Sequence, residues 1–215
     1  GGGGGGGGSA GARPVLLELL ACAELPEGHP GRLSEAAAYA SAFFVLCATY
    51  EATAALIGAT LLSLLHSPRA LATVRRQHAS DRAVHAAVSE ALRYCSPIKA
   101  TRREVRCDLA LASGETLRRG DRVSFVHAAL NLDADAFSHP TRYDVARPAS
   151  ELRLHAGFGL GAHRSPAWRL GLVAACEAAQ AVLRACPRLR LAPGYKPEWK
   201  PLDSLHCLTT LHVCG

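Results

Sequence analysis

A glycine-punctuated loop near the C-terminal end of the chain leads directly into an apolar helix. Its sequence is HAGFGLGAHRSPAWRL, residues 155–170. Gly159 and Gly161 have no side chains, so the backbone there can approach a large, flat group. His163 and Arg164 add positive charge where the first N–H groups of the helix already favour an anion or an anionic metal ligand. The loop therefore predicts a site that a large, flat group can approach and that favours an anion or an anionic metal ligand.

The loop resembles the haem-binding loop of cytochromes P450. In that family the pattern is Phe-x-x-Gly-x-x-x-Cys-x-Gly, and the Cys thiolate is the axial ligand of the iron. Phe158, Gly161 and His163 match this pattern, whereas Ser165 stands at the position of the Cys and Ala167 at the position of the last Gly. The resemblance implies a P450 whose iron ligand has been changed.

Ser165 is the residue that decides the chemistry of this loop. A Cys thiolate pushes electron density onto the iron and favours O–O cleavage. A serine hydroxyl is a far weaker acid and a harder donor, so Ser165 is only a weak candidate as a metal ligand. His163 in the family reaches toward a haem propionate, and we therefore do not expect it to replace the ligand.

A second motif lies upstream, in the segment VSEALRYCSP that covers residues 88–97. Glu90 and Arg93 are three residues apart, so they share one face of a helix. Taken alone, such a pair is more often an ordinary surface pair, which contributes roughly 0.2–0.5 kcal/mol. The segment resembles the P450 K helix, and residues 131–147 resemble the family segment that ends in a second Arg. The resemblance implies a buried structural triad of Glu90, Arg93 and Arg147, because buried charges persist only when paired.

A long apolar segment begins after Ser34, a plausible helix N-cap, and ends near Pro68. Glu51 is its only formally charged residue between positions 36 and 65, so a transmembrane helix is the competing interpretation. The mid-span Glu51, together with the small and polar residues around it, argues against a span. The segment resembles instead the P450 I helix, which crosses the distal face of the haem.

The I-helix motif of the family is altered here. Ala-Gly-x-(Asp or Glu)-Thr reads Ala-Thr-Tyr-Glu-Ala over residues 48–52, so the acid is Glu51 and the alcohol is replaced by Ala52. Thr53 is adjacent but points roughly 100° further round the helix. The resemblance implies catalytic roles in proton delivery for Glu51 and, partly, for Thr53. The competing interpretation of Glu51 is a capped or paired core carboxylate.

The resemblance also implies a haem cofactor, whose propionates the family holds with cationic side chains. Arg103 stands six residues after Pro97, at the position of such an Arg, and Arg102 is its neighbour. A guanidinium can hold a carboxylate through two hydrogen bonds. The cofactor-binding residues that we expect are Phe158, Gly159, Gly161, His163, Ser165 and Arg103.

The fold that follows from these motifs is mainly α with small β-sheets, the C-terminal portion of a P450 from the I helix to the terminal strands. Residues 1–14 begin with eight glycines and are expected to form a flexible leader. Residues 15–215 are expected to form one partial P450-like domain. Because the I helix is normally covered on all sides, such a portion is expected to expose apolar surface.

Charge and cysteine content suggest compartment and partners. The net charge is +6, but the arginines are scattered without an aromatic stacking pattern, so no specific nucleic-acid partner is expected. The eight cysteines, with no secretory signal, favour a reducing compartment, and we expect a cytoplasmic protein without a membrane anchor. The resemblance implies a ferredoxin or reductase as redox partner, and the missing N-terminal half of the fold as a further one.

Three functional interpretations remain open. The first is haem-dependent monooxygenation of a small hydrophobic substrate, impaired by Ser165 and Ala52. The second is a degenerate P450-like domain that keeps its structural triad and serves in binding or interaction. The third is a haem protein with altered chemistry, in which serine ligation favours other reactions than monooxygenation.

Overall fold

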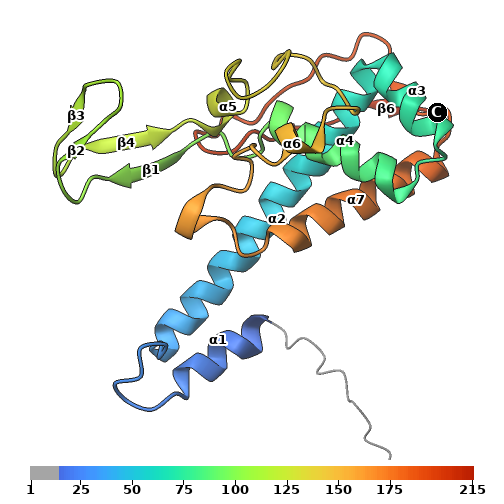
Figure 1. The fold of residues 1–215 in the computed structure, drawn as a ribbon. Coiled ribbons are helices and arrows are strands. Elements are labelled where there is room, and N and C mark those ends of the chain that lie inside the picture. The colour runs from blue at the N-terminus through green and yellow to red at the C-terminus, as the bar shows by residue number, and fades with distance from the viewer. Residues whose placement is uncertain (1–14) are drawn as a thin grey trace, which may run out of the picture. The chain divides into compact units, whose positions relative to one another are not determined.

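The computed structural model describes residues 15–215, and the expected leader over residues 1–14 lies outside the described residues. Helices predominate, with short strands between α4 and α5 and at the C-terminal end (Figure 1). The elements in chain order are α1 (Val15–Ala23), α2 (Glu35–His66), α3 (Pro68–Arg76), α4 (Asp81–Tyr94), β1 (Thr101–Glu104), β2 (Leu109–Ala110), β3 (Thr116–Leu117), β4 (Arg122–Phe125), α5 (His127–Leu130), α6 (Ala149–Leu152), the 3-10 helix η1 (Gly161–His163), α7 (Trp168–Ala185), β5 (Arg190–Leu191) and β6 (Val213–Cys214).

The described sheets are small and antiparallel. β1 pairs with β4, and Thr101 lies opposite Phe125 at one end of this ladder. β2 pairs with β3 and β5 pairs with β6, each over two residue pairs. The predicted fold class, mainly α with small β-sheets, is confirmed.

The described chain divides into two compact units, and the division falls between Ala48 and Thr49 inside α2. The sequence had predicted one partial domain over residues 15–215. In the first unit, the backbone N–H of Leu33 donates to the carbonyl of Cys22 at 3.0 Å and closes the loop after α1. The Ser34 hydroxyl accepts from the N–H of Ala37 at 3.1 Å, which confirms the predicted N-cap of α2.

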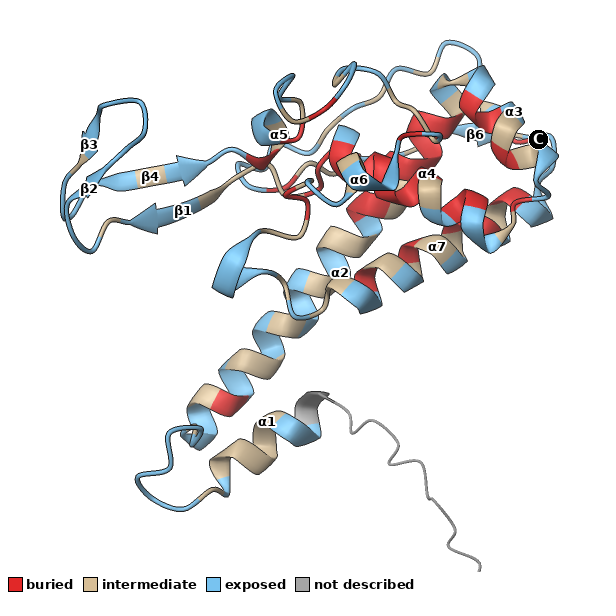
Figure 2. Cartoon of the chain, in the orientation of Figure 1, coloured by how far each residue is buried: buried red, intermediate tan, exposed pale blue. Residues whose placement is uncertain are grey.

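The apolar residues of α2 differ in burial along the helix (Figure 2). Phe43 and Phe44 are 69% and 70% exposed, whereas Leu56 and Leu64 are almost fully buried. Of the described helices, α2 is the one that is long and apolar enough to cross a membrane, by length and composition alone. The exposed apolar residues agree with the expectation that this portion of the fold leaves apolar surface uncovered.

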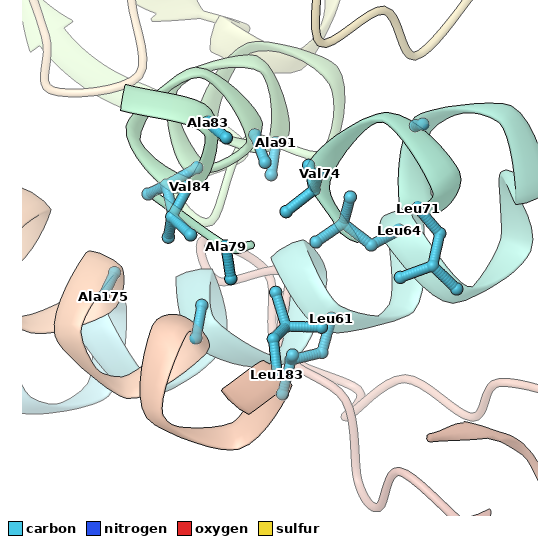
Figure 3. Packing of buried hydrophobic residues seen from close by; sticks show 14 of the residues in the cluster. Leu61, Leu64, Leu71, Val74, Ala79, Ala83, Val84, Ala91, Ala175 and Leu183 are labelled. Atoms are coloured by element: carbon cyan, nitrogen blue, oxygen red, sulfur yellow. The ribbon is translucent and has the colours of Figure 1, made fainter. Parts of the chain in front are cut away.

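The hydrophobic core of the second unit is built around α4, which packs against α3 and α7 (Figure 3). Small and branched apolar residues recur along α4. This pattern suits close packing, because alanines let the neighbouring helices approach. Ser67 and Ser80 cap α3 and α4 by accepting from backbone N–H groups three residues later. The core residues include Leu64, Val74, Val84, Val88, Leu92, Ala175, Ala179 and Leu183.

Candidate functional site

A fully buried charge cluster joins α4 to the irregular segment that follows α5. The Glu90 carboxylate accepts from Arg93 Nε and Nη2 at 2.9 and 2.7 Å. It also accepts from Arg147 Nε, at 3.1 Å to one oxygen and 3.0 Å to the other. The side chains of Glu90 and Arg93 are wholly buried, and that of Arg147 is 2% exposed. The structure therefore brings the three residues of the expected triad into one contact network, and does not leave Glu90 and Arg93 as a surface pair.

Backbone carbonyls complete the hydrogen bonding of the two guanidiniums. Arg93 Nη1 donates to the carbonyls of Asn131 and Pro140 at 2.7 and 2.8 Å. Arg93 Nη2 and Arg147 Nη2 both donate to the carbonyl of Arg142, at 3.1 and 3.2 Å. A buried guanidinium is tolerated only where its N–H groups find partners. The cluster thus fixes the path of the segment from 131 to 147, which has no regular backbone ladder of its own.

The acidic groups around Arg147 keep its side chain charged. Burial acts to lower the pKa of Arg147, but the hydrogen bond to Glu151 and the nearby Glu90 carboxylate raise it on balance. Glu151 lies in α6, one helical turn after Arg147, and accepts from Arg147 Nη1 at 2.6 Å. Burial, followed by the charge of Glu90, raises the pKa of Tyr143, whose hydroxyl donates to the carbonyl of Ala87. The phenol therefore stays neutral beside the carboxylate.

Asn131 connects this cluster to the glycine-rich loop, and the sequence did not single it out. Its side chain is fully buried, and its amide Nδ2 donates to Ser96 Oγ at 2.6 Å. Its Oδ1 accepts from the backbone N–H of Ala156 at 2.6 Å, two residues before Phe158. Its own carbonyl accepts from Arg93. The only sequence signal was its place at the start of the segment that resembles the family motif.

The stem of the loop lies tightly against α4. A Cβ atom on Gly157 would lie 2.5 Å from Leu92 Cγ and 2.8 Å from Leu92 Cδ1, so only glycine fits there. His155 Nδ1 accepts from the N–H of Gly157 at 3.1 Å. Burial, with the charges of Arg164 and Arg93, lowers the pKa of His155 to about 4. The imidazole is therefore neutral at physiological pH.

The loop itself turns through two glycines with left-handed backbone angles. Gly159 has φ of 75° and Gly161 has φ of 67°, conformations that side-chain-bearing residues avoid. The N–H of Ser165 donates to the carbonyl of Phe158 at 2.8 Å and closes the loop. No side chain caps the first turn of α7, and Ser165 is partly buried just before it. The residues that match the P450 loop therefore form a closed turn at a helix N-terminus.

Aromatic and cationic groups gather at this helix entrance. The rings of Phe158 and Trp168 lie 6.5 Å apart. The guanidinium carbons of Arg164 and Arg169 lie 4.5 and 5.1 Å from the centre of the Trp168 ring. Cation–π contacts of this kind hold a flexible Arg in place. The loop thus presents fixed positive charge beside the Ser165 hydroxyl.

Thr53 and Glu51, the two residues expected to have catalytic roles in the I helix, differ in exposure. Thr53 is partly buried, and its Oγ1 is 3.3 Å from the place that a Cβ on Gly171 would occupy, so α2 and α7 approach closely there. Phe158 Cε1 is 3.7 Å from the same place. Glu51 is exposed. The competing interpretation, a paired core carboxylate at Glu51, does not match this exposure, and Glu51 forms no ion pair among the described residues.

The two cationic candidates for a propionate contact are both at the surface. His163 is exposed within η1, and Arg103 is exposed on β1. Arg103 Nη1 donates to the carbonyl of its neighbour Arg102 at 2.8 Å. Both side chains are therefore free of ion pairs among the described residues.

The donor set of the loop fits only part of a haem centre. The glycines, Phe158 and the cations suit a flat group with carboxylates at its edge, and the first turn of α7 suits an anionic donor. Ser165 stands where the resemblance places the axial Cys, however, and a hydroxyl lacks the acidity and softness by which a thiolate holds iron. The residues present do not fit a haem–thiolate centre.

A family model described as cytochrome P450 matches residues 13–164, more than half of the chain. The triad, the I-helix segment and the glycine loop up to Arg164 all fall within the matched residues. The chain belongs to the cytochrome P450 family.

Relatives with curated names support the same assignment. The chain is 35% identical over 164 residues to 20-oxo-5-O-mycaminosyltylactone 23-monooxygenase of Streptomyces fradiae, which covers 76% of this chain and 37% of the relative. It is 33% identical over 187 residues to cytochrome P450-SOY of Streptomyces griseus, covering 86% of this chain and 44% of the relative. The chain thus spans less than half the length of these two relatives.

Solved structures resemble the described fold. Ligand-free CYP164A2 of Mycobacterium smegmatis superposes with a TM-score of 0.81 and 27% identity, covering 95% of this chain and 49% of that chain. The prediction of a bacterial-type P450 fold of partial length is confirmed at the level of family, fold and coverage.

Proposed function

We propose that this chain is the portion of a bacterial P450 that runs from the I helix to the terminal strands, and that its haem monooxygenase chemistry is impaired. The observation that carries the proposal is the contrast between an intact buried cluster and an altered donor. In the cluster, the buried Glu90 carboxylate forms ion pairs with both Arg93 and Arg147. Ser165 offers a hydroxyl where the family uses a thiolate.

The family activity is haem-dependent oxidation of a small hydrophobic substrate, and relatives such as the Streptomyces fradiae enzyme are named as monooxygenases. Two changes act against that activity here. Ser165 cannot supply the electron push that favours O–O cleavage. Ala52 removes the alcohol of the I-helix motif, and Thr53 lies against α7 near Gly171, where it offers only partial rescue. The exposed Glu51 remains the candidate acid.

If haem binds, we propose that it does so on the face of the loop formed by Phe158, Gly159 and Gly161. Exposed His163 and Arg103 would then contact the propionates. Bound haem would supply redox chemistry at its iron. The chain's own residues would orient it through the closed turn between Phe158 and Ser165. Electrons would come from a ferredoxin or reductase in the cytoplasm, as in P450s of this type.

The alternative is a P450-derived scaffold that has lost its cofactor and serves as an interaction domain. One observation favours it specifically, the exposed aromatic and aliphatic residues in the first half of α2. Phe43, Phe44 and Leu46 are each about two-thirds or more exposed, and contiguous exposed apolar surface marks interaction sites. The partner that we propose for this surface is the remaining portion of a P450 fold, supplied by the same or another polypeptide. We do not propose that the surface contacts a membrane.

A hemin titration tests the proposal on the purified chain and on two variants. We expect the unchanged chain to give no ferrous carbonyl spectrum of the thiolate type after dithionite and carbon monoxide. We expect Ser165→Cys to gain that spectrum with saturable, stoichiometric hemin binding. Ser165→Ala is the matched control, because it changes the same atom without adding a thiol.

Each outcome separates the alternatives. A thiolate-type spectrum in the unchanged chain would mean that another cysteine ligates the iron, and impairment through Ser165 would be wrong. Unsaturable hemin binding by all three proteins would favour the interaction domain. Saturable binding by the unchanged chain with a spectrum unlike that of a thiolate would favour altered haem chemistry.

A further inference from the structure

A cavity of about 620 Å³ lies in the second unit, away from the glycine loop. Its walls come from the end of α2, the start of α3, the end of α4, the segment 142–146 and the stretch around Trp199. None of the expected haem-binding residues lines it. Its volume falls within the range of about 300–1,000 Å³ that is usual for small-molecule sites.

Two positively charged side chains belong to the lining of the cavity. Arg69 and Arg142 line it, together with the first turn of α3, which contains no acidic residue. Pro68 has no N–H and the N–H of Ala70 donates to Ser67 Oγ, so what this helix end offers an anion is mainly the positive end of its dipole. Asp144 is the one carboxylate among the residues that line this cavity, and its oxygen lies 3.9 Å from Arg142 Nη2. That pair is long and partly exposed, so Arg142 remains available to a ligand.

A hydroxyl also belongs to the lining of the cavity. Ser63 is only 7% exposed and lines the cavity. Thr60, one turn earlier in α2, donates its hydroxyl to the carbonyl of Leu56 at 2.8 Å. Among the described residues no group hydrogen-bonds to the Ser63 hydroxyl in this way. The Ser63 hydroxyl is therefore free to donate to a polar group that enters the cavity.

Part of the lining is apolar and aromatic. Leu62, Tyr94, Val145 and Trp199 line it. The Trp199 ring is fixed by stacking on His206, with ring centres 3.8 Å apart. Fixed aromatic faces give a large contact area to a planar apolar group.

We propose that this cavity binds a small organic anion with an apolar ring, of the arylcarboxylate class. The carboxylate lies at the end formed by Arg69, Arg142 and the first turn of α3, within reach of the Ser63 hydroxyl. The ring lies against Tyr94 and Trp199. The site shares no residue with the haem loop, so it does not depend on the outcome at Ser165.

Calorimetric titration of the full chain with phenylacetate tests this site, with phenylacetamide as the uncharged analogue and inorganic phosphate as the anion without a ring. We expect saturable binding of one phenylacetate. Because a hydrogen bond to a charged group contributes about 1.5–3 kcal/mol, we expect phenylacetamide to bind at least about tenfold more weakly. Phosphate is expected to bind more weakly than phenylacetate, because it cannot use the aromatic wall.

Variants locate the binding. Arg142→Gln changes an exposed side chain but keeps the backbone carbonyl that the buried arginines use, and it should weaken phenylacetate binding about tenfold or more. Arg76→Gln, in α3 but outside the cavity lining, is the control and should change affinity less than about twofold. Ala146→Phe fills the cavity from an exposed position and should abolish binding.

Three results would overturn the proposal. They are absence of phenylacetate binding by the folded chain, equal binding of phenylacetamide or of phosphate, and undiminished binding by Ala146→Phe. Circular dichroism of each variant distinguishes a lost site from a lost fold. Ser165→Cys should bind phenylacetate as the unchanged chain does.

Discussion

The buried cluster around Glu90 and the glycine loop around Ser165 both match motifs of the same family, yet the two regions differ in how their side chains are buried and paired. In the cluster, every charged group has its partner, and backbone carbonyls from the segment 131–147 satisfy the remaining N–H groups. In the loop, the backbone turn is closed between Phe158 and Ser165, and Ser165 stands at the position that the resemblance assigns to the thiolate ligand. Glu51 and His163 are exposed.

This contrast distinguishes residues that stabilise the fold from residues that are expected to contact a cofactor. Loss of one member of a buried charge network leaves its partners unpaired and destabilises the whole chain. Loss of a ligand atom in a half-exposed loop leaves the fold intact.

The largest effect that we expect comes from Glu90→Gln. It removes the charge that two buried guanidiniums share, and breaking a buried pair in this way costs about 3–5 kcal/mol. Glu104→Gln, in an exposed pair with Arg106 at 3.9 Å, is the control and should have little effect. Urea unfolding followed by circular dichroism measures both. If the two variants unfold at similar urea concentrations, the cluster is not what holds this region together.

His155 gives the stem of the loop a pH dependence. Its pKa is about 4 in the folded chain because of burial and two nearby arginines, against 6.5 for an unperturbed histidine. The unfolded chain therefore takes up a proton first as pH falls. The free energy of unfolding therefore falls by roughly 3 kcal/mol between about pH 6.5 and 4. Above pH 7, His155 is neutral in both the folded and the unfolded chain, so it adds no pH dependence there.

His155→Asn isolates that contribution. Asn keeps an acceptor for the N–H of Gly157 and does not titrate, so the variant should lose less stability on acidification than the unchanged chain. His127, whose pKa burial also lowers, contributes in the same direction and should account for part of the remaining slope. Urea midpoints at pH 7, 6, 5 and 4 provide the comparison. Equal slopes in the two proteins would show that His155 is not held neutral.

Gly157→Ala tests the close contact between the loop stem and α4. The added Cβ would lie 2.5 Å from Leu92 Cγ, and overpacking of this kind costs about 1–3 kcal/mol. Gly58→Ala in α2 is the matched control, because its Cβ would meet Leu208 Cδ1 at an ordinary 3.5 Å. The control should be stabilised by up to about 1 kcal/mol through helix propensity. Destabilisation of both variants alike would mean that the stem is not specially tight.

Sequence spacing predicted much of this arrangement. The three-residue separation of Glu90 and Arg93 placed them on one helical face, and Ser34 marked the start of α2. Such signals are local, because they depend on helix geometry and capping. The fold class followed from the order of the motifs.

The remaining features depend on long-range contacts that no local pattern encodes. Asn131 joins Ser96 and Ala156, which are 35 and 25 residues away in the chain. Glu151 is an acid in a four-residue helix, and only the buried Arg147 gives it a role. The exposure of Glu51 depends on which groups cover α2, and helical periodicity does not report that.

The smallest effect that we expect is from Ser165→Ala. Among the described residues, Ser165 forms hydrogen bonds through its backbone. Its N–H donates to the carbonyl of Phe158, and its carbonyl accepts from the N–H of Trp168. Removal of the hydroxyl should therefore change the free energy of unfolding by less than about 0.5 kcal/mol. A loss approaching that of Glu90→Gln would show that Ser165 has become a structural residue. The loop would then have a role in stability, and the contrast between the two regions would no longer hold.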